Sequence, residues 1–502
     1  MSSREARLIL DALTSSGVTV SRLCADSRTV QAGDIFLAYP GAKSDGRRFI
    51  ADAVKRGAAA VLWEREGFAW DPALLVPHLA WDGLAKVLGD LAHLVYGEPS
   101  TRLRLIGVTG TNGKTSITQW LSRSFTAMHE RCGVVGTLGI GYPDAIEEGL
   151  NTTPDGIVLH SALADFVADG ARAVAMEVSS IGIDQARVAG ARFDTAVFTN
   201  LTRDHLDYHG TMEAYAAAKA RLFAWPGLRA AVINLDDEFG LDLARDCGPR
   251  LSNTIGYTLG DSPEHLPEGV HPLVAVDLHG TATGQRFTVL WSGMRAEVEV
   301  SIVGRFNVSN LLAVMGVLLA AGHAFEDVAG VIAQLHPPPG RMQAVGGVMQ
   351  PLVVVDYSHT PDALEQALKA LRPAAQARGG RLVCVFGCGG DRDPGKRPMM
   401  GAVASRLADR VVLTSDNPRS EDPQAILAQI AAGAGPSAVV EADRAGAIRH
   451  AIDQAAADDV ILLAGKGHEP YQEIAGKRLA FSDIEHARAA LDAWGLPPGV
   501  RS

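Results

Sequence analysis

The segment Gly110-Thr-Asn-Gly-Lys-Thr115 has the residue types and the spacing of a phosphate-binding loop. It follows a β-rich apolar run, Leu103–Val108, and leads into a helical pattern, Ser116–Phe125. At such a strand–turn–helix junction, the backbone N–H groups and the helix dipole bind anions. Lys114 would then reach the outer phosphates of a nucleotide, and the Thr115 hydroxyl would bind Mg²⁺. We therefore predict a nucleoside-triphosphate site.

One position departs from the most common phosphate-loop pattern, G-x-x-x-x-G-K-[ST]. Val108 stands where the first glycine is expected, so a tight turn at Gly110 would replace it. The alternative interpretation is an ordinary Gly-rich turn before a helix, which would bind no nucleotide. The strand on one side and the helix on the other favour the nucleotide site.

Polar side chains also follow other strands predicted for the central part of the chain. Glu177 lies near the end of the β-rich run Ala173–Val178, and the segment Asn200–His209 follows the run Thr195–Thr199. Open α/β sheets bind ligands beyond the carboxyl ends of their strands. The Asp and His residues of this loop suit a hard cation and phosphate, although a polar loop that only hydrogen-bonds to itself is the alternative. Lys219, by pattern alone, resembles a solvated lysine on a helix.

A third group of polar loops lies in the C-terminal part of the chain. The segment Gly387–Asp393 follows a strand but fails the dinucleotide pattern G-x-G-x-x-G, because Arg392 occupies the third glycine position. Arg392 and Arg419 each follow a strand and offer a planar fork to a carboxylate. The segment Gly465–Glu469 follows the last strand, so its backbone and Glu469 could receive an ammonium group. Each loop alone is more often a site of surface ion pairs, whereas the three together on one sheet edge predict a zwitterionic ligand.

Composition excludes several classes of protein. With 502 residues, of which 47% are hydrophobic and 21% charged, the chain has the composition of a globular protein of about three domains. Its formal net charge of −11 argues against nucleic acid or an anionic membrane as a general partner. The N-terminal residues lack the apolar segment of a signal peptide, and the longest apolar helical run, Leu311–Ala321, is too short to span a bilayer. Five scattered cysteines without a C-x-x-C pair indicate free thiols in a reducing cytoplasm.

The chain divides into three predicted α/β domains, residues 1–98, 99–336 and 337–502. Three prolines in Pro337–Arg341 favour an extended hinge before the third domain. In the second domain, β-rich runs alternate with helical patterns, which is typical of a parallel sheet, and residues 252–304 predict an antiparallel patch. The strands expected beyond those given above are Ala230–Asn234, Leu273–Leu278, Arg286–Trp291, Ala296–Ile302, Leu352–Asp356, Arg381–Phe386, Arg410–Leu413 and Val460–Ala464.

These residues resemble the Mur ligases of bacterial cell-wall synthesis, almost from end to end of the chain. The matching motifs are Asp26-Ser-Arg28 with Gly33-Asp34, Gly110–Thr115, Asn151–Pro154, Glu177–Ser180, Asn200–His209, Tyr215–Phe223, Asn234–Asp237, Gly304–Asn307 with Asn310, Pro339–Met342, Asp356–Asp362, Asp416–Arg419 and Gly465–Glu469. So many motifs in one order make a coincidence negligible.

The resemblance implies an N-terminal α/β domain that binds a uridine nucleotide sugar, a central phosphate-loop domain with a mainly parallel sheet, and a C-terminal Rossmann-like α/β domain that binds an amino acid. It implies ATP-dependent addition of meso-diaminopimelate to UDP-N-acetylmuramoyl-L-alanyl-D-glutamate through an acyl phosphate, with Mg²⁺. These small molecules are the expected partners of a cytoplasmic monomer that binds neither nucleic acid nor a membrane.

The resemblance also assigns roles to individual residues. In the family the lysine matched by Lys219 is carbamylated, and the resulting carboxylate helps to hold Mg²⁺. The implied metal set is Thr115, Glu177, His205 and carbamylated Lys219, and the implied catalytic residues are Lys114, Lys219 and His205. ATP would be bound by Gly110, Thr111, Asn112, Gly113, Lys114, Thr115, Asn307, Asn310, Arg341 and Asp356. The nucleotide-sugar dipeptide would be bound by Ser27, Asn151, Thr152, Thr153, Ser179, Gln185 and Arg187, and diaminopimelate by Arg392, Asp416, Asn417, Pro418, Arg419, Gly465 and Glu469.

Three positions depart from the family pattern. Ile181 stands where relatives commonly carry His, Gln343 where Glu is usual, and Arg47 where His often follows Asp-Gly. The first departure is expected to alter contacts with the peptide substrate. None of the three belongs to the phosphate loop or the implied metal set.

Three other functions compete with this interpretation. The same ligation with L-lysine is disfavoured, because Arg419 matches a carboxylate that diaminopimelate has and lysine lacks. A folylpolyglutamate-synthase-like ligase should lack the Asp26-Ser-Arg28 domain and the Asp416–Arg419 loop. A nucleotide-driven switch or motor would have no use for a pair of carboxylate-binding arginines.

Overall fold

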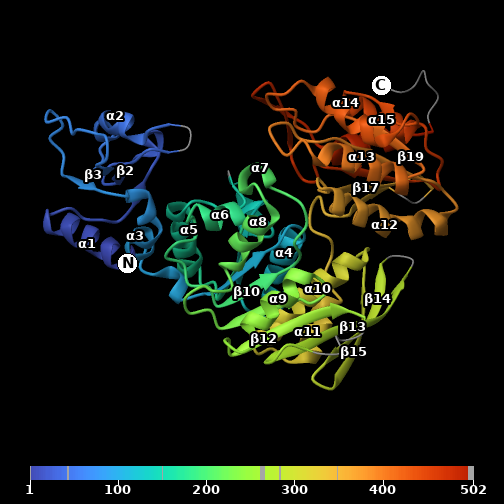
Figure 1. The fold of residues 1–502 in the computed structure, drawn as a ribbon, viewed down its shortest axis with the longest axis horizontal. Coiled ribbons are helices and arrows are strands. Elements are labelled where there is room, and N and C mark those ends of the chain that lie inside the picture. The colour runs from blue at the N-terminus through green and yellow to red at the C-terminus, as the bar shows by residue number, and fades with distance from the viewer. Residues whose placement is uncertain are drawn as a thin grey trace. The chain divides into compact units, whose positions relative to one another are not determined.

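The computed structural model describes residues 2–41, 44–147, 149, 151–260, 266–281, 284–346 and 349–495. The chain forms two compact units that interleave along the sequence. The first unit comprises Met1–Thr109, Phe125–Val197 and Ala218–Ala231, and the second comprises Gly110–Ser124, Phe198–Ala217 and Val232–Ser502. Figure 1 shows the helices and strands of the chain, coloured from the N-terminus to the C-terminus.

The N-terminal sheet has four parallel strands in sequence order, β1 (Leu23–Cys24), β2 (Ile35–Ala38), β3 (Ala60–Glu64) and β4 (His78–Trp81). Both faces are covered. Leu37 and Leu62 pack in one cluster with residues of α1 (Ser2–Ser15) and α3 (Leu88–Val95). Phe36 and Val61 point to the other face and pack with residues of α2 (Ile50–Lys55), as expected for alternating side chains in buried strands (Figure 1).

The central sheet has eleven strands, in the order β15-β14-β13-β12-β11-β10-β5-β9-β6-β7-β8. Their bounds are β5 (Arg104–Thr109), β6 (Cys132–Gly136), β7 (Gly139–Tyr142), β8 (Ala145–Glu147), β9 (Ala173–Glu177), β10 (Thr195–Phe198), β11 (Ala230–Asn234), β12 (Asn253–Leu259), β13 (Val270–Gly280), β14 (Gln285–Trp291) and β15 (Met294–Val300). Strands β5, β9 and β6 pair in parallel, and β13, β14 and β15 pair antiparallel. The parallel region confirms the prediction from the sequence. Within the predicted patch of residues 252–304, β13 to β15 are antiparallel as predicted, whereas β12 pairs in parallel with β13.

The helices of the central region follow its strands. They are α4 (Lys114–Ala127), α5 (Gly156–Ala168), α6 (Ser180–Asp184), α7 (Leu206–His209), α8 (Met212–Ala220), α9 (Glu238–Cys247), α10 (Arg305–Ala320) and α11 (Phe325–Ile332). Helix α10 carries the apolar run Leu311–Ala321, is buried along most of its length and contacts β12 and β13 (Figure 1). It is therefore a core helix, as predicted. Within the described residues, every helix is too short or too polar to cross a bilayer.

The C-terminal sheet has the order β16-β17-β21-β18-β19-β20, and every pair is parallel except β16 with β17. Its strands are β16 (Gln343–Gly346), β17 (Leu352–Asp356), β18 (Leu382–Phe386), β19 (Arg410–Leu413), β20 (Val439–Val440) and β21 (Val460–Ala464). Strands β17, β18, β19 and β21 confirm the predicted ones, whereas β16 and β20 were not predicted. A separate hairpin, β22 (Tyr471–Ile474) and β23 (Lys477–Ala480), follows β21.

Helices cover both faces of this sheet, as in a doubly wound fold. One face packs with α12 (Pro361–Arg378), α13 (Lys396–Leu407) and α14 (Pro423–Ala434), and the other with α15 (Arg444–Asp453) and α16 (Asp483–Asp492) (Figure 1). Leu462 of β21 lies in the first cluster and Leu463 in the second. Such strands need apolar residues at successive positions, which explains the uninterrupted apolar sequence of β21.

All five cysteines are free and buried: Cys24, Cys132, Cys247, Cys384 and Cys388. Burial raises the pKa of Cys247 to about 11 and that of Cys388 to about 12. These thiols are therefore protonated packing residues, and the expectation of free cysteines is confirmed.

An ion pair between Arg444 and Asp483 is completely buried where α15 and α16 begin. The Arg444 guanidinium donates two hydrogen bonds to Asp483, at 2.7 and 2.6 Å, and a third to the Ala464 carbonyl at 3.0 Å. Replacing Arg444 with methionine leaves a buried carboxylate without its cation, so we expect the free energy of unfolding to fall by about 3–5 kcal/mol. Urea denaturation measures this loss.

The double variant Arg444→Met, Asp483→Leu is the control, because it removes both charges. Its loss should be much smaller than that of the single variant. Equal losses in the two variants would show that the uncompensated charge is not the cause.

Candidate functional site

The predicted phosphate loop lies between β5 and α4 and is anchored to the segment that follows β10. The Asn112 amide donates to Asn200 Oδ1 at 2.9 Å, and the Thr199 hydroxyl donates to the Asn112 carbonyl at 2.6 Å. Gly110 has a φ of +145°, and a Cβ there would lie 1.8 Å from Thr199 Oγ1. The loop therefore needs glycine at this position, which supports the tight turn predicted at Gly110.

The two residues at the start of α4 have defined contacts. Lys114 Nζ donates to the carbonyls of Gly110 and Thr111, at 2.9 and 2.8 Å, so its ammonium group lies over the loop. Thr115 is buried, and its hydroxyl accepts a hydrogen bond from Arg341 at 2.9 Å. The Arg341 guanidinium also stacks on the Tyr357 ring, 4.5 Å from its centroid. An anion at this loop would thus meet two cations.

The other residues expected to bind ATP lie around the same loop or support it. Asn310 and Asn307 are buried on α10, and a Cβ on Gly113 would lie 2.4 Å from Asn310 Oδ1. Asp356 ends β17 and accepts hydrogen bonds from the Met342 amide, at 2.8 Å, and from the Ser358 hydroxyl. Because Met342 follows Arg341, Asp356 fixes the backbone beside the arginine that contacts Thr115.

Most residues expected to bind the dipeptide form one hydrogen-bonded cluster at the ends of β6 and β9. Thr153 donates to the Glu177 carbonyl at 2.9 Å and accepts from the Ser179 amide at 2.9 Å. Arg187 donates to the Thr153 carbonyl at 2.9 Å and to Gln185 Oε1 at 2.7 and 3.0 Å. Thr152, Asn151 and Ser27 complete the predicted set: the Thr152 hydroxyl bonds to that of Thr137 at 3.0 Å, Asn151 is exposed, and Ser27 lies in the 3₁₀ turn Ser27–Thr29 of the N-terminal domain.

Thr137 is a site residue that the sequence did not reveal. The Glu177 carboxylate is almost fully buried and accepts bonds from the Thr137 amide, at 2.8 Å, and the Thr137 hydroxyl, at 3.0 Å. Thr137 follows β6, which pairs with β9, so the two strands end side by side. The signal that could have found it is its position directly after a β-rich run.

The predicted loop Asn200–His209 contains a buried carboxylate surrounded by basic groups. Asp204 lies 3.4 Å from His205, 3.8 Å from His359 and 3.9 Å from Lys396, measured between nitrogen and oxygen atoms. Burial alone would raise the pKa of Asp204, but the hydrogen bond from His359 and the nearby positive charges hold it well below its usual range. Asp204 is therefore ionised, and it joins His205 to residues from two C-terminal segments.

Lys219 is buried, with 1% of its surface exposed. The prediction of a solvated lysine, made from the helix pattern alone, was therefore wrong. Helix α8 and the turns after it are packed on the side that carries Tyr215, Lys219 and Phe223, all of which are buried. Tyr215 and Lys219 are spaced four apart and share one face of α8, and Phe223 lies in the turn that follows. A buried lysine needs a partner or a modification that removes its positive charge.

The chemistry of the donors suits the metal set implied by the resemblance. Glu177 offers a buried carboxylate, Thr115 a hydroxyl, His205 an imidazole, and a carbamate on Lys219 would add two more oxygens. Hard cations such as Mg²⁺ prefer oxygen ligands. Within the described part of the chain, no group of three or more His, Cys, Asp and Glu side chains could hold a metal by itself. The metal set stays a prediction that depends on the carbamate.

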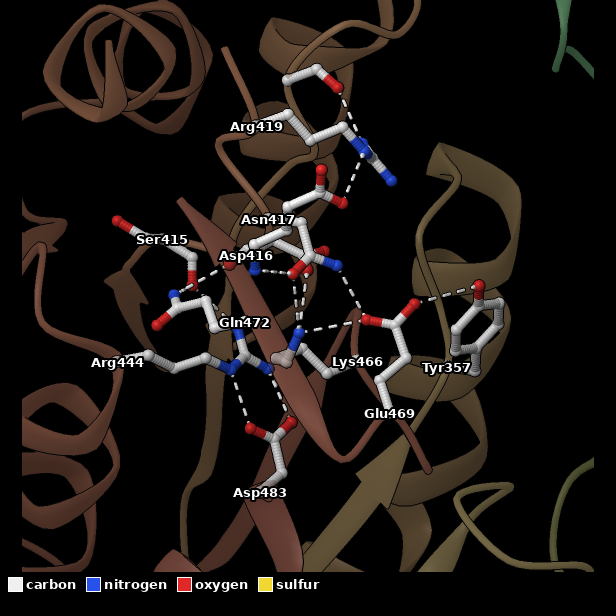
Figure 2. A network of polar contacts seen from close by, with 12 residues as sticks. Tyr357, Ser415, Asp416, Asn417, Arg419, Arg444, Lys466, Glu469, Gln472 and Asp483 are labelled. Carbon is white, nitrogen blue, oxygen red and sulfur yellow. Dashed lines mark hydrogen bonds and ion pairs between the residues drawn. The ribbon is translucent and has the colours of Figure 1, made fainter. Parts of the chain in front are cut away.

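The three polar loops predicted for the C-terminal domain meet at one sheet edge, because β21, β18 and β19 are neighbours. Figure 2 shows part of their network. Arg419 Nη1 donates to the Gly390 carbonyl at 2.7 Å, and Asn417 Nδ2 donates to Glu469 Oε2 at 2.8 Å. A cation and a carboxylate therefore lie in neighbouring loops, which supports the predicted zwitterion pocket.

The remaining predicted residues of this pocket shape its loops. Arg392 is exposed and donates to the Asp391 carbonyl at 2.9 Å. Gly390 packs so closely on the Pro418 carbonyl that a Cβ there would lie 1.9 Å from it. Gly465 has a φ of +112°, and a Cβ there would lie 2.9 Å from Asp416 Oδ2. Bulkier side chains at either glycine would push the loops apart.

Two further charged residues of the pocket, Lys466 and Glu473, were not singled out from the sequence. Lys466 Nζ donates to Asn417 and Glu469 at 3.1 and 3.0 Å, and Glu473 lies 3.9 Å from Arg419 (Figure 2). Burial, with the nearby charges of Arg341 and Lys466, lowers the pKa of His468 to about 3. His468 is therefore neutral beside these cations.

For two of the three positions that depart from the family pattern, the structure shows which contacts the side chain makes. Arg47 forms a bidentate ion pair with Asp45, with a shortest N–O distance of 2.7 Å, and its guanidinium lies over Phe68. Gln343 accepts a hydrogen bond from the Gly340 amide at 2.8 Å, a contact that a glutamate oxygen could also make. Nothing in the contacts of Ile181, on α6, explains the third departure.

Three family models match successive parts of the chain. They are the Mur ligase family, catalytic domain, over residues 19–96, the Mur ligase middle domain over residues 108–318, and the Mur ligase, glutamate ligase domain over residues 340–467. Together they match most of the described chain, in the order that the sequence motifs indicated.

Individual relatives match almost the whole chain. The UDP-N-acetylmuramoyl-L-alanyl-D-glutamate–2,6-diaminopimelate ligase of Ectopseudomonas mendocina is 54% identical over 484 residues, which cover 95% of this chain and 96% of that one. The enzyme of the same name from Pseudomonas aeruginosa is 53% identical, with the same coverage.

Solved structures of similar proteins share the fold. A structure of a UDP-N-acetylmuramoyl-L-alanyl-D-glutamate–2,6-diaminopimelate ligase is 38% identical, with a TM-score of 0.65, over 94% of this chain and 95% of that one. The MurF ligase of Thermotoga maritima in complex with ADP has a TM-score of 0.66 at 18% identity, over 94% of this chain and 97% of that one, which shows likeness of fold alone.

Proposed function

Because the chain belongs to the Mur ligase family, we propose that it is an ATP-dependent amide ligase that adds meso-diaminopimelate to UDP-N-acetylmuramoyl-L-alanyl-D-glutamate in peptidoglycan precursor synthesis. The 54% identity over 95% of the chain carries this proposal. The pocket of Arg419, Asn417 and Glu469 supports it, because diaminopimelate has a second carboxylate and a second ammonium group on the carbon that does not react.

The reaction has two steps. The D-glutamyl side-chain carboxylate attacks the γ-phosphorus of ATP, which forms an acyl phosphate and releases ADP. The amine of diaminopimelate then attacks the acyl carbon, loses a proton, and displaces inorganic phosphate as the amide bond forms. Phosphate is a good leaving group, whereas the oxygen of a free carboxylate is not.

Residues around the phosphate loop stabilise the first step. Lys114 and Arg341 place two positive charges at the start of α4. These charges would stabilise the negative charge on the phosphoryl group during its transfer. Lys114 Nζ donates to two loop carbonyls, and we infer that the same ammonium group donates to the phosphate oxygens of the bound nucleotide. Arg341 is held by its stacking on Tyr357 and by the Asp356 contact with the next residue.

The proposed ligands of Mg²⁺ are Thr115, Glu177, His205 and the carbamate of Lys219. When bound, Mg²⁺ supplies positive charge that stabilises the transferring phosphoryl group. The match of Lys219 to the lysine that is carbamylated in the family supports the carbamate, and its burial keeps the side chain away from bulk solvent.

We assign the substrates to three domains, residues 1–98 for the uridine nucleotide, 99–336 for ATP and 337–502 for diaminopimelate. The cluster of Thr152, Thr153, Ser179, Gln185 and Arg187 would hold the peptide part of the nucleotide substrate beside Glu177. We propose that the enzyme is a cytoplasmic monomer without a nucleic-acid or membrane partner, because its formal net charge is −11 and its substrates are small anions.

Phosphate release from ATP in the presence of the UDP-muramoyl dipeptide tests the amino-acid choice. We expect release to depend on meso-diaminopimelate and to remain near background with L-lysine, because lysine lacks the carboxylate that Arg419 would bind. A substrate series with a folate and glutamate tests the folylpolyglutamate-synthase alternative. Release that is equally fast with lysine, or that requires a folate, would contradict the proposal.

A further inference from the structure

Lys466 is completely buried among the side chains that form the amino-acid pocket. Its ammonium nitrogen lies 3.0 Å from Glu469 Oε2, 3.1 Å from Asn417 Oδ1 and 3.7 Å from Asp416 Oδ1 (Figure 2). The three partners come from the loops after β19 and β21. Lys466 therefore connects both loops, although no part of its side chain is exposed to a ligand in the pocket.

The contacts of Lys466 fix the orientation of two pocket side chains. Asn417 Oδ1 accepts from Lys466 and from the Glu473 amide at 2.9 Å, so Nδ2 must face Glu469, to which it donates at 2.8 Å. Glu469 Oε2 accepts from both Lys466 and Asn417. The other oxygen, Oε1, lies 3.5 Å from the Tyr357 hydroxyl, and this oxygen is left to receive a ligand donor.

We propose that Lys466 is a positioning residue that makes the pocket selective for the ammonium group on the non-reacting carbon of diaminopimelate. The inference rests on the proposed function, since it assigns Glu469 Oε1 to that ammonium group. Lys466 acts through Glu469, both directly and by turning the Asn417 amide toward that carboxylate, and it does not touch the substrate.

The charges around Lys466 explain why a buried cation helps to bind another cation. Asp416 and Glu469 carry two negative charges and Lys466 one positive charge, so the group keeps one net negative charge for the ligand. Without Lys466, two carboxylates would lie together at low exposure with no cation between them. Glu469 would then turn toward water, away from the position in which Oε1 can accept from the ammonium group of the ligand.

The backbone of the two loops is held by other residues, which separates positioning from folding. Arg444 donates to the Ala464 carbonyl at the end of β21. Gln472 Nε2 donates to the Asp416 carbonyl at 2.8 Å (Figure 2). These bonds remain when Lys466 is replaced. We therefore expect a Lys466 variant to fold and to lose selectivity.

The test compares meso-diaminopimelate with 2-aminopimelate, which has the same chain and carboxylates but lacks the second amino group. The measured quantity is the ratio of kcat/KM for the two compounds, or of their affinities as competitors where turnover is slow. Lys466→Met is expected to reduce this ratio about tenfold or more, mainly by raising the KM for diaminopimelate. The KM for ATP should stay within about twofold, because Lys466 contacts neither the phosphate loop nor Arg341 or Asp356 in the contacts above.

Arg381→Met is a matched control in the same domain. Arg381 also pairs with a buried carboxylate, that of Asp459, at 2.6 Å. This pair lies just before β18 and β21 begin, so it is at the opposite ends of these strands from the amino-acid pocket. Its loss should lower stability and leave the ratio unchanged. Lys466→Arg keeps the cation and should retain more of the ratio than Lys466→Met does.

Two results would overturn the proposal. One is an unchanged ratio in Lys466→Met. The other is a further loss of the ratio when Lys466→Met is added to Glu469→Gln, because a residue that acts through Glu469 has no effect once that carboxylate is gone. The double variant also removes one of the two carboxylates left without Lys466 by the single one, so it reduces the risk of misfolding. Failure of the proposed function looks different: the wild type itself would release no phosphate with diaminopimelate.

Discussion

Replacing Lys219 with alanine is expected to reduce diaminopimelate-dependent phosphate release by a factor on the order of 10²–10³ or more, as for the loss of a group that stabilises transition-state charge. Lys219 is buried near the end of α8 and matches the lysine that is carbamylated in the family. If its carbamate holds Mg²⁺, a small carboxylic acid that enters the cavity of the alanine variant should restore part of the activity. Turnover with and without added formate or acetate measures this rescue.

Lys369→Ala is the matched control for this variant. Lys369 is more than half exposed on α12 and pairs with Glu365, an i,i+4 contact that contributes little stability. It should keep full activity and gain nothing from formate. Normal turnover of Lys219→Ala would contradict the metal-linked role. The carbamate would also be contradicted if mass spectrometry of active enzyme, equilibrated with bicarbonate, showed the mass of the unmodified chain without an added CO₂.

Replacing Arg419 with alanine is expected to raise the KM for diaminopimelate by a factor of at least tens, which corresponds to about 2–5 kcal/mol. Its guanidinium is largely buried, binds the Gly390 carbonyl at 2.7 Å and lies 3.9 Å from Glu473. Diaminopimelate differs from lysine by one carboxylate, and an arginine fork binds a carboxylate with two parallel hydrogen bonds. Steady-state kinetics with each substrate varied in turn measure the effect.

The KM values for ATP and for the nucleotide dipeptide should change far less, since the residues proposed to bind them do not include Arg419 or its contacts. Arg410→Ala is a suitable control, because Arg410 begins the same strand that leads to the Arg419 loop and is exposed at the opposite end. It should leave all three KM values unchanged. If Arg419→Ala altered neither the KM for diaminopimelate nor the discrimination against lysine, the specificity assignment would fail, while the ligase assignment would stand.

Local sequence was sufficient for the elements that carry the site. Apolar β-rich runs predicted β5, β9, β10, β17, β18, β19 and β21 to within a residue or two, because strands buried on both faces need apolar residues at every position. The loops after these strands could be located for the same reason. Their convergence in the C-terminal domain followed from one rule, that parallel neighbouring strands end at the same edge of a sheet.

The two strands of the C-terminal sheet that were not predicted are its short edge strands. Strand β16 contains Gln and Gly, and β20 has only two residues, both exposed. Edge strands have few buried side chains, so their sequences carry a weak apolar pattern. They form because a neighbouring strand offers free hydrogen-bonding groups, which is a property of the assembled sheet.

The sequence by itself determined the order of the elements, the phosphate loop and the residue types that gather beyond the strands, because each depends on neighbours within a few residues. Tertiary structure alone decided which groups meet. It buried Lys219, whose helix pattern gave no sign of burial, and it brought Arg341 to Thr115, 2.9 Å apart. It also placed Lys466 between two carboxylates from different loops. The strength of an electrostatic contact depends on distance and desolvation, and both are set by residues far away in the chain.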